Sequence, residues 1–289
     1  MSIMSNPHRI TIGEIDYANA WPLFKGFERQ AEGLVYEMIA RVPSELNRLL
    51  SAGELDLSAI SSFSYGQYCD DYVLMPGLSV GSIGRVHSIL LFMKEPLEKR
   101  KPRKIAVTTT SETSINLLKI IMAMRFELEP EYVRAEPDLK AMLKDADAAL
   151  LIGDPAITAS WHTDGLHVLD LGELWNNWTG LGMTYAVVAA RRSAVEKHQG
   201  ELRAAYEALL AVKAQNQRDT GPLIQRACAT LGGESSYWET YFRSLQYDFG
   251  DKLQAGLSLY FRYARELNLL RHEARLTFYE GHSPQKVKE

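Results

Sequence analysis

Small polar residues follow or interrupt several of the apolar runs that predict buried strands in this 289-residue chain. These residues are Asn19, Ser61, Ser62, Ser88 and Asp154. Amide, hydroxyl and carboxyl groups gathered at strand ends can bind and orient a small polar molecule. Their types and spacing therefore predict a ligand cleft between strand ends.

Ser88 lies in the stretch 83–94, which predicts a glycine-containing turn followed by a buried strand. Alternation along a strand would place Ser88 on one face and His87 on the other. This argues against a Ser–His catalytic pair, and the chain has no GxSxG motif. The Ser88 hydroxyl then either bonds within the core or lines the cleft, and the similar residues at other strand ends favour the cleft.

Each of the other candidates has a structural alternative. Asn19 could form a turn after the predicted strand 9–15. Ser61 and Ser62 could cap the helix that follows them. Asp154 could act as an acid or base, or it could cap the helix that begins at the next residue.

The segment 108–114 is rich in hydroxyl groups and precedes an apolar helix predicted over 115–126. Ser111 and Thr113 belong to it. Free N–H groups at a helix start, together with hydroxyls, can hold a carboxylate or a phosphate. Because no P-loop pattern is present, a carboxylate is favoured, and capping is the alternative.

Composition limits the function classes. The chain is 46% hydrophobic and 24% charged with a net charge of −4, which is typical of a globular protein with no attraction to nucleic acid or anionic membranes. Cys69 and Cys228 lie far apart in the sequence and form neither a CxxC pair nor a disulfide framework, which fits a reducing compartment. The chain shows no signal peptide and no apolar run of about 20 residues, so we expect a cytoplasmic protein.

Neither a metal nor a cofactor is expected. The histidines are scattered and do not have the spacing of zinc ligands. The glycines between 81 and 84 are too sparse for a dinucleotide fingerprint.

The pattern of elements predicts an α/β fold with two lobes and a helical C-terminal region. Strands are expected at 9–15, 34–40, 55–60, 73–75, 83–94, 104–109, 148–152, 167–171 and 183–190. A glycine-rich turn is expected at 77–84, and the charged segment 95–103 predicts a surface connection. Helices are expected at 195–217, 223–231, 235–245 and 253–267.

Six motifs in a fixed order resemble the menaquinone-biosynthesis family of the futalosine pathway, and within it the chorismate dehydratase branch. They are 12–13 with 16–23 (Asp-Tyr-Ala-Asn-Ala-Trp-Pro-Leu), 53–62, 84–91, 110–114, 150–154 and 175–181. The resemblance covers roughly residues 10–190 and does not extend over the C-terminal helices.

The resemblance implies a type II periplasmic-binding-protein-like fold with a central ligand cleft. One lobe would comprise 1–94 with 189–289 and the other 95–188, with crossings near 93–96 and 187–190. The family reaction removes water from chorismate and gives 3-[(1-carboxyvinyl)oxy]benzoate, without a cofactor.

The family's functional Asn and Ser would fall on Asn19 and Ser88. Substrate-binding positions would be Ser61, Ser62, Ser111, Thr113, Asp154, Thr179 and Gly180. The expected partner is a small carboxylate, with no nucleic acid or membrane, and either a monomer or a homodimer is possible.

Two departures from the family pattern bear on the substrate. Gly182 and Met183 stand where the family has Pro-Phe, and Glu14 stands where an aromatic residue is common. Two alternatives remain open on sequence grounds: 1,4-dihydroxy-6-naphthoate synthase of the same pathway, and a non-catalytic solute-binding protein.

Overall fold

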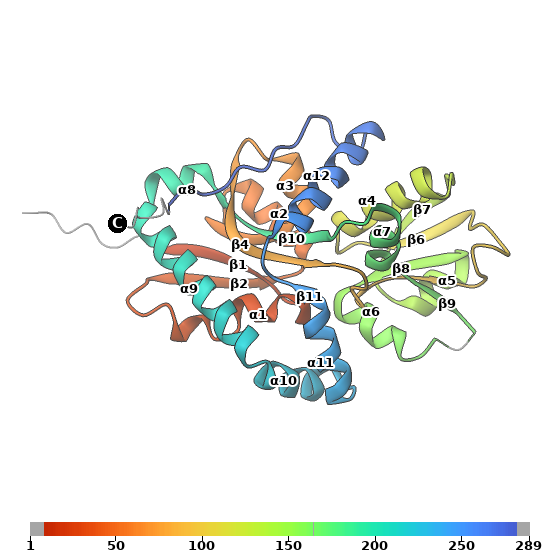
Figure 1. Cartoon of the computed structure of the whole chain (residues 1–289), viewed down its shortest axis with the longest axis horizontal. Coiled ribbons are helices and arrows are strands. Elements are labelled where there is room, and N and C mark those ends of the chain that lie inside the picture. Colours follow the sequence, from red (N-terminus) through yellow and green to blue (C-terminus); the bar gives the residue numbers. More distant parts are fainter. Residues whose placement is uncertain (1–8, 164, 282–289) are drawn as a thin grey trace, which may run out of the picture.

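The computed structural model describes residues 9–163 and 165–281. Two α/β lobes lie side by side, each built on its own sheet (Figure 1). The C-terminal helices pack on the first lobe and reach the junction between the lobes. No helix in the described part of the chain is long and apolar enough to cross a membrane.

The first lobe holds a six-stranded sheet in the order β11-β4-β10-β3-β1-β2. Its strands are β1 (Ile10–Ile15), β2 (Tyr36–Arg41), β3 (Leu57–Ser61), β4 (Tyr72–Ser82), β10 (Met183–Arg191) and β11 (Leu245–Gln246). β1 runs parallel to β2 and β3, whereas β10 runs antiparallel to β3 and β4. The chain therefore leaves β1 and β3 at the same edge of the sheet.

Helices cover both faces of this sheet. They are η1 (Ala18–Ala20), α1 (Trp21–Phe24), η2 (Phe27–Arg29), α2 (Pro43–Ala52), α3 (Ser62–Gln67), α8 (Arg192–Lys197), α9 (Gln199–Arg218), α10 (Gly221–Leu231), α11 (Ser235–Ser244) and α12 (Asp251–Glu266). The single helix predicted over 195–217 is two helices, because the chain turns at His198.

The second lobe holds a five-stranded sheet in the order β7-β6-β8-β5-β9. Its strands are β5 (Ile89–Met93), β6 (Lys104–Thr108), β7 (Glu131–Ala135), β8 (Ala148–Ile152) and β9 (His167–Asp170). Its helices are α4 (Thr113–Ile120), η3 (Ile121–Arg125), α5 (Leu139–Asp145), α6 (Gly153–Ser160) and α7 (Leu171–Thr179).

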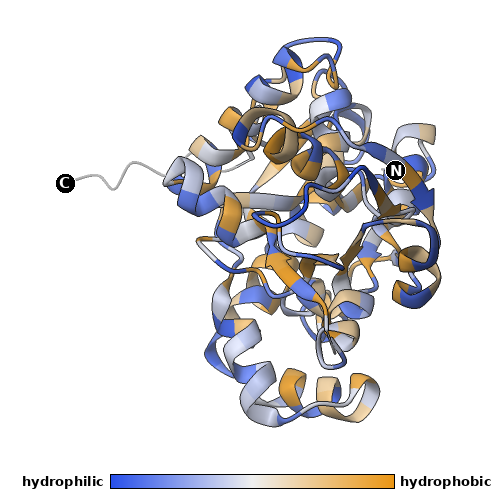
Figure 2. Cartoon of the chain, turned by 90° about the vertical axis from the view of Figure 1, so that its right-hand side faces the viewer, coloured by the Kyte–Doolittle hydropathy of each residue, from blue (hydrophilic) through white to orange (hydrophobic). Residues whose placement is uncertain are grey.

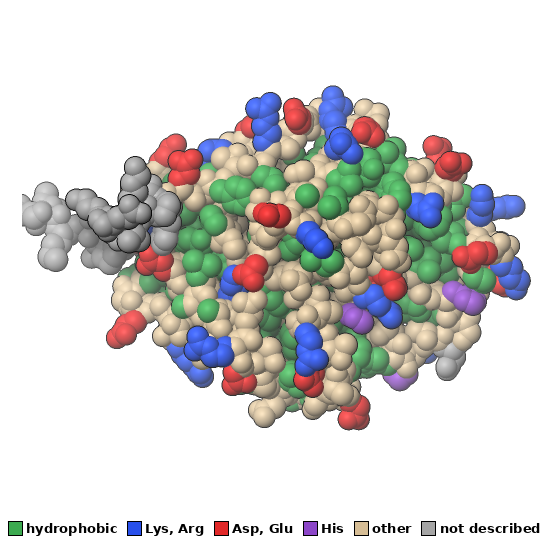
Figure 3. All heavy atoms as spheres, viewed as in Figure 1, with side chains coloured by type: hydrophobic (Ala, Val, Ile, Leu, Met, Phe, Trp, Pro, Cys, Tyr) green, Lys and Arg blue, Asp and Glu red, His purple; other side chains and the backbone are tan. Residues whose placement is uncertain are grey.

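The core follows the predicted alternation in β5. Ile89, Leu91 and Met93 pack into the large core that joins the two lobes, and Leu90 and Phe92 pack into a smaller cluster on the other face. Figure 2 shows hydrophobic and hydrophilic residues alternating along the outer helices, as expected for helices with one buried face. In Figure 3 basic and acidic side chains are interspersed over the visible face, in keeping with the small net charge.

The lobe boundaries differ from those predicted. β5 belongs to the second sheet and β10 to the first, so the chain crosses at 83–88 and 180–182 rather than at 93–96 and 187–190. Gly84 and His87 have positive φ angles of 89° and 61°, and these turns in the backbone separate β4 from β5. An apolar pattern predicts a strand, but it does not tell which sheet the strand joins.

The glycine-rich turn predicted over 77–84 is also wrong. Its first six residues continue β4 as far as Ser82, and the register against β10 shifts twice along the strand. Gly81 lies against Leu253 of α12 and the carbonyl of Met183, where a Cβ atom would be 2.8 Å from both neighbours. The glycine there permits close packing within a strand, not a turn.

Candidate functional site

Three of the predicted site residues, Asn19, Ser88 and Asp154, lie where strand ends of the two lobes face one another. Asn19 lies in η1, directly after β1, and Asp154 lies in the first turn of α6, directly after β8. The backbone N–H of Ala18 donates to Oδ1 of Asp154 at 3.0 Å. This hydrogen bond joins the two lobes beside Asn19.

Asn19 has an unused acceptor. Its Oδ1 atom is buried and has no hydrogen-bond partner among the residues that the structure describes. Buried polar atoms are almost always paired in folded proteins. The Asn19 Oδ1 atom is therefore available to a ligand, and the local turn that could explain an Asn here does not engage this oxygen.

Asp154 does not cap its own helix as the alternative supposed. Its carboxylate accepts the N–H of Ala18 from the other lobe. Burial raises the pKa of Asp154 to about 6, the Ala18 N–H acts against this shift, and the nearby Asp16 adds to it. A carboxyl group with this pKa can take up or release a proton near neutral pH.

Ser88 lies just before β5, at the same edge. Its carbonyl accepts the N–H of Gly153 at 2.7 Å, which ties it to the start of α6. Its hydroxyl makes a long bond of 3.3 Å to the Val86 carbonyl. The Ser88 hydroxyl is close enough to the Tyr241 hydroxyl of α11 to lower the pKa of Tyr241, while burial above all, and then Asp154, raise that pKa well above its ordinary value.

The segment before Ser88 is held by a buried carboxylate that we did not single out from the sequence. Asp170, at the end of β9, accepts the N–H groups of Val86 and His87 at 3.1 and 2.7 Å. It also accepts the N–H groups of Gly172 and Glu173 at the start of α7. Asp170 thus fixes the crossing segment and, through it, the position of Ser88.

The hydroxyls at the start of α4 are already engaged. Ser111 accepts the N–H of Ser114 at 3.2 Å and so caps the helix. The Thr113 hydroxyl accepts the N–H of Phe63, from α3 of the first lobe, at 3.0 Å. Since a hydroxyl that accepts one bond can still donate another, Thr113 retains a donor for an anion.

The two serines after β3 differ. Ser61 accepts hydrogen bonds from the N–H of Ser64 and the side-chain amide of Asn47, at 3.2 and 3.0 Å, so its role here is capping. The Ser62 hydroxyl is buried and unpaired among the described residues. Of the two, Ser62 is the one whose hydroxyl is available for a ligand.

Thr179 and Gly180 end α7. The Thr179 hydroxyl donates to the Trp175 carbonyl and accepts the N–H of Leu181. Gly180 has a φ angle of 72° and forms the left-handed cap of the helix. These contacts are local, and they do not join the two residues to Asn19, Ser88 or Asp154.

The two departures from the family pattern lie in well-packed surroundings. Glu14 forms an ion pair with Lys25 inside the first lobe. Gly182 packs against α12, where its carbonyl would be 1.8 Å from a Cβ atom placed on Gly256. Trp175 also donates its indole N–H to that carbonyl, at 3.1 Å.

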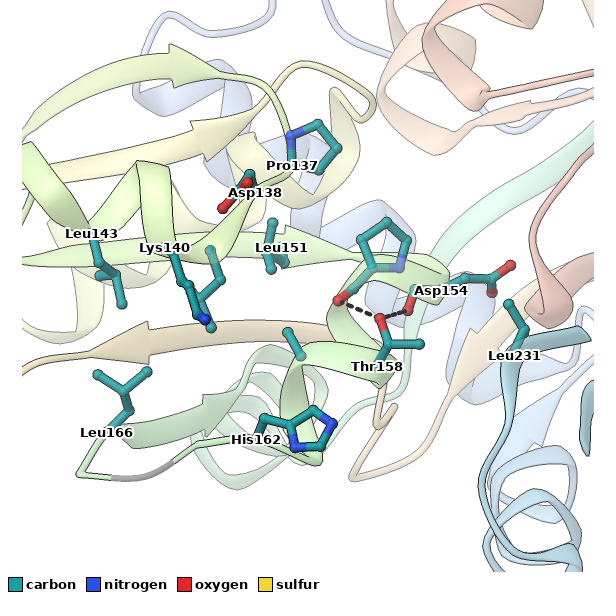
Figure 4. Close-up of a pocket in the computed structure, with 13 residues that line it drawn as sticks. Pro137, Asp138, Lys140, Leu143, Leu151, Asp154, Thr158, His162, Leu166 and Leu231 are labelled. Atoms are coloured by element: carbon teal, nitrogen blue, oxygen red, sulfur yellow. Dashed lines mark hydrogen bonds between the residues drawn. The ribbon is translucent and has the colours of Figure 1, made fainter.

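An open cavity of about 1050 Å³ lies on the second lobe between α5 and α6. Its apolar lining is mostly leucine, including Leu231 from α10 of the first lobe, and Lys140 and His162 are among its polar residues. Figure 4 shows the Asp154 carboxylate pointing out of this cavity toward the first lobe. Asp154 is the one residue that the cavity shares with the predicted site.

No three His, Cys, Asp or Glu side chains of the described chain come together as metal ligands would.

Sequence reasoning missed Tyr241 and Asp170. The aromatic residues of α11 gave only a helical pattern, and Asp170 ended a strand without any motif around it.

Comparisons with known proteins agree with this architecture. The sequence model of the family described as menaquinone biosynthesis matches residues 10–266. The chorismate dehydratase of Thermus thermophilus is 37% identical over 191 residues, which cover 61% of this chain and 68% of that protein. The 1,4-dihydroxy-6-naphthoate synthase of the same organism is 31% identical over 165 residues, 57% of each chain.

Two solved structures share the fold. Protein AF1704 from Archaeoglobus fulgidus superposes with a TM-score of 0.72 at 24% identity, covering 92% of this chain and all of that one. The periplasmic aliphatic sulphonate binding protein SsuA from Escherichia coli superposes with a TM-score of 0.66 at 17% identity, covering 97% and 96%. The chain therefore has a periplasmic-binding-protein-like fold and belongs to the menaquinone biosynthesis family.

Proposed function

We propose that this protein is a chorismate dehydratase, a hydro-lyase that converts chorismate to 3-[(1-carboxyvinyl)oxy]benzoate. It would act in the futalosine pathway, in the cytoplasm. The observation that carries the proposal is the similarity to the Thermus thermophilus chorismate dehydratase, which is longer and higher than that to the naphthoate synthase of the same organism. The unpaired polar atoms between the two lobes support it.

The reaction needs little chemical assistance. A ring carbon beside the enolpyruvyl ether loses a proton, the neighbouring carbon loses hydroxide, and the two make one water. Because the ring becomes aromatic, the step is strongly downhill. The protein must orient the substrate, stabilise the departing hydroxide and provide a proton acceptor.

In this proposal the Asn19 oxygen accepts a hydrogen bond from the substrate and orients it, and the Ser88 hydroxyl donates to the leaving hydroxyl. The Asn19 oxygen without a partner among the described residues and the long Ser88 bond support these roles. The Thr113 hydroxyl at the start of α4 would bind a substrate carboxylate. The proton acceptor is either a carboxylate of the substrate itself or Asp154, which is largely ionised at pH 7 with a pKa of about 6.

Contacts between the lobes, such as Ala18 with Asp154 and Phe63 with Thr113, close the site. Substrate entry therefore requires these contacts to open, and closure then excludes water from the reaction. Oligomeric state does not enter this mechanism, because every residue invoked lies in one chain.

The second candidate, naphthoate synthase, is favoured only by the 31% identity to that enzyme.

A direct comparison of substrates separates the dehydratase from the naphthoate synthase. The chelator-treated protein is incubated with chorismate or with the cyclised futalosine derivative, and products are followed by mass spectrometry. Loss of water from chorismate alone supports the proposal, and conversion of the cyclised compound alone contradicts it. Thermal stabilisation by chorismate without turnover would instead indicate a binding protein.

A further inference from the structure

A tyrosine of the C-terminal helices reaches the candidate site with an unused hydroxyl. Tyr241 of α11 is 1% exposed, and its hydroxyl has no hydrogen-bond partner among the residues that the structure describes. Buried hydroxyls without a partner are uncommon, because desolvating them is unfavourable. The Tyr241 hydroxyl is therefore available to a ligand.

The surroundings of this hydroxyl are those of the candidate site. It faces the hydroxyl of Ser88, and the Asp154 carboxylate is near enough to affect it. The bond from Ser88 to the Val86 carbonyl is long, at 3.3 Å, so the Ser88 hydroxyl can also turn toward a ligand. Two hydroxyls from distant parts of the sequence thus converge beside one carboxylate.

The Tyr241 ring is fixed by other aromatic rings. Trp238 packs edge-on against it, with the ring centroids 5.6 Å apart, and Tyr237 stacks on it, with the ring centroids 6.3 Å apart. Trp161, at the end of α6 in the second lobe, packs against Trp238 at 6.2 Å. In Figure 1 α11 lies beside α6 at the junction of the lobes. The hydroxyl is therefore held in place before any substrate binds.

We propose that Tyr241 is a further substrate-contacting residue, whose hydroxyl donates a hydrogen bond, together with Ser88, to the hydroxyl group that leaves chorismate. The inference rests on the proposed function. Burial above all raises the pKa of Tyr241 well above its ordinary value, with the nearby Asp154 adding to the shift and the Ser88 hydroxyl acting against it, so the group stays protonated. It donates a hydrogen bond and keeps its proton, and the water formed takes its second proton from the substrate ring.

The test compares Tyr241→Phe with Tyr237→Phe in the full chain, with chorismate as substrate. Tyr237 also has a buried hydroxyl without a hydrogen bond of normal geometry among the described residues, but its neighbouring hydroxyl is that of Ser160. We expect Tyr241→Phe to lower kcat at least about tenfold with a much smaller change in KM, because the bond is made to the leaving group. The melting temperature should change little, since the removed hydroxyl makes no hydrogen bond of normal geometry to any residue that the structure describes. Tyr237→Phe should keep both kcat and melting temperature.

A double variant adds a second readout. If Ser88 and Tyr241 act on the same leaving group, combining Ser88→Ala with Tyr241→Phe should cost little more than the larger single loss. Independent multiplication of the two losses contradicts this shared contact. Normal kcat in Tyr241→Phe, or a loss that follows a lowered melting temperature, overturns the inference while the proposed function stands. A wild-type protein that leaves chorismate intact overturns both.

Discussion

The backbone N–H of Ala18 donates to the Asp154 carboxylate at 3.0 Å, although the two residues belong to different lobes. This bond brings the turn that carries Asn19 against the start of α6. Burial of Asp154 at this junction raises its pKa to about 6, although the bond from Ala18 itself acts against the shift. Closure of the lobes and the protonation of one carboxyl group are thus linked.

The first prediction concerns this carboxyl group. Its pKa is raised from an ordinary value of 3.8, so the folded state favours the protonated form. Wild type should therefore lose stability relative to Asp154→Asn as the pH rises from about 4 to about 6, by up to about 3 kcal/mol, and the difference should then stay constant. Denaturant unfolding of both proteins between pH 3.5 and 7.5 measures it. A difference that does not change with pH would mean that the carboxyl group titrates normally.

Asn19 and Asn47 offer a contrast between a functional and a structural amide. The Asn19 oxygen has no partner within the described part of the chain, whereas Asn47 bonds Ser61 through both its oxygen and its nitrogen. Asn19→Ala should reduce turnover about a hundredfold and change the free energy of unfolding by less than about 1 kcal/mol. Asn47→Ala should reduce that free energy by about 1–3 kcal/mol. Turnover assays and denaturant unfolding of both variants decide the matter, and equal activity of Asn19→Ala and wild type would remove Asn19 from the site.

Gly153 tests how closely the lobes must meet. Its φ angle is 61°, and a Cβ atom there would lie 2.7 Å from the ring of Tyr17 in the first lobe. Gly33 has a φ of 78° with no atom within 4 Å of the same position. Gly33→Ala should cost about 1–2 kcal/mol of stability, from backbone strain alone, and keep activity. Gly153→Ala should cost more and also lower turnover. Equal effects of the two substitutions would show that the contact with Tyr17 does not matter.

Asp170 is expected to act through Ser88. An Asn in its place would put an amide donor where the backbone N–H groups of Val86, His87, Gly172 and Glu173 now find acceptors. Asp170→Asn should therefore reduce stability by about 2–3 kcal/mol and lower turnover as the crossing segment loosens. Asp138→Asn is the matched control, because Asp138 only caps α5 at the surface. Full activity of a destabilised Asp170→Asn would show that the crossing segment keeps Ser88 in place without it.

The sequence predicted the two-lobe fold and most strands, because β3, β5 and β8 are short apolar runs with clear ends. It misplaced the crossings, since apolarity does not reveal which sheet a strand joins. It could not show that Ser61 and Ser111 bond N–H groups at helix starts while the Asn19 oxygen finds no partner among the described residues, because capping and binding residues are of the same type. Tyr241 was out of reach for another reason: only the folded chain brings α11 to Ser88.

The central claim is that this protein removes water from chorismate at the site between its two lobes. The most direct measurement incubates the purified full chain, and its Ser88→Ala variant, with chorismate and quantifies substrate and product by mass spectrometry. The account predicts that wild type converts chorismate to an equal amount of 3-[(1-carboxyvinyl)oxy]benzoate and water, and that Ser88→Ala is slowed at least about tenfold. Chorismate left unchanged by wild type, or converted equally fast by Ser88→Ala, would contradict it.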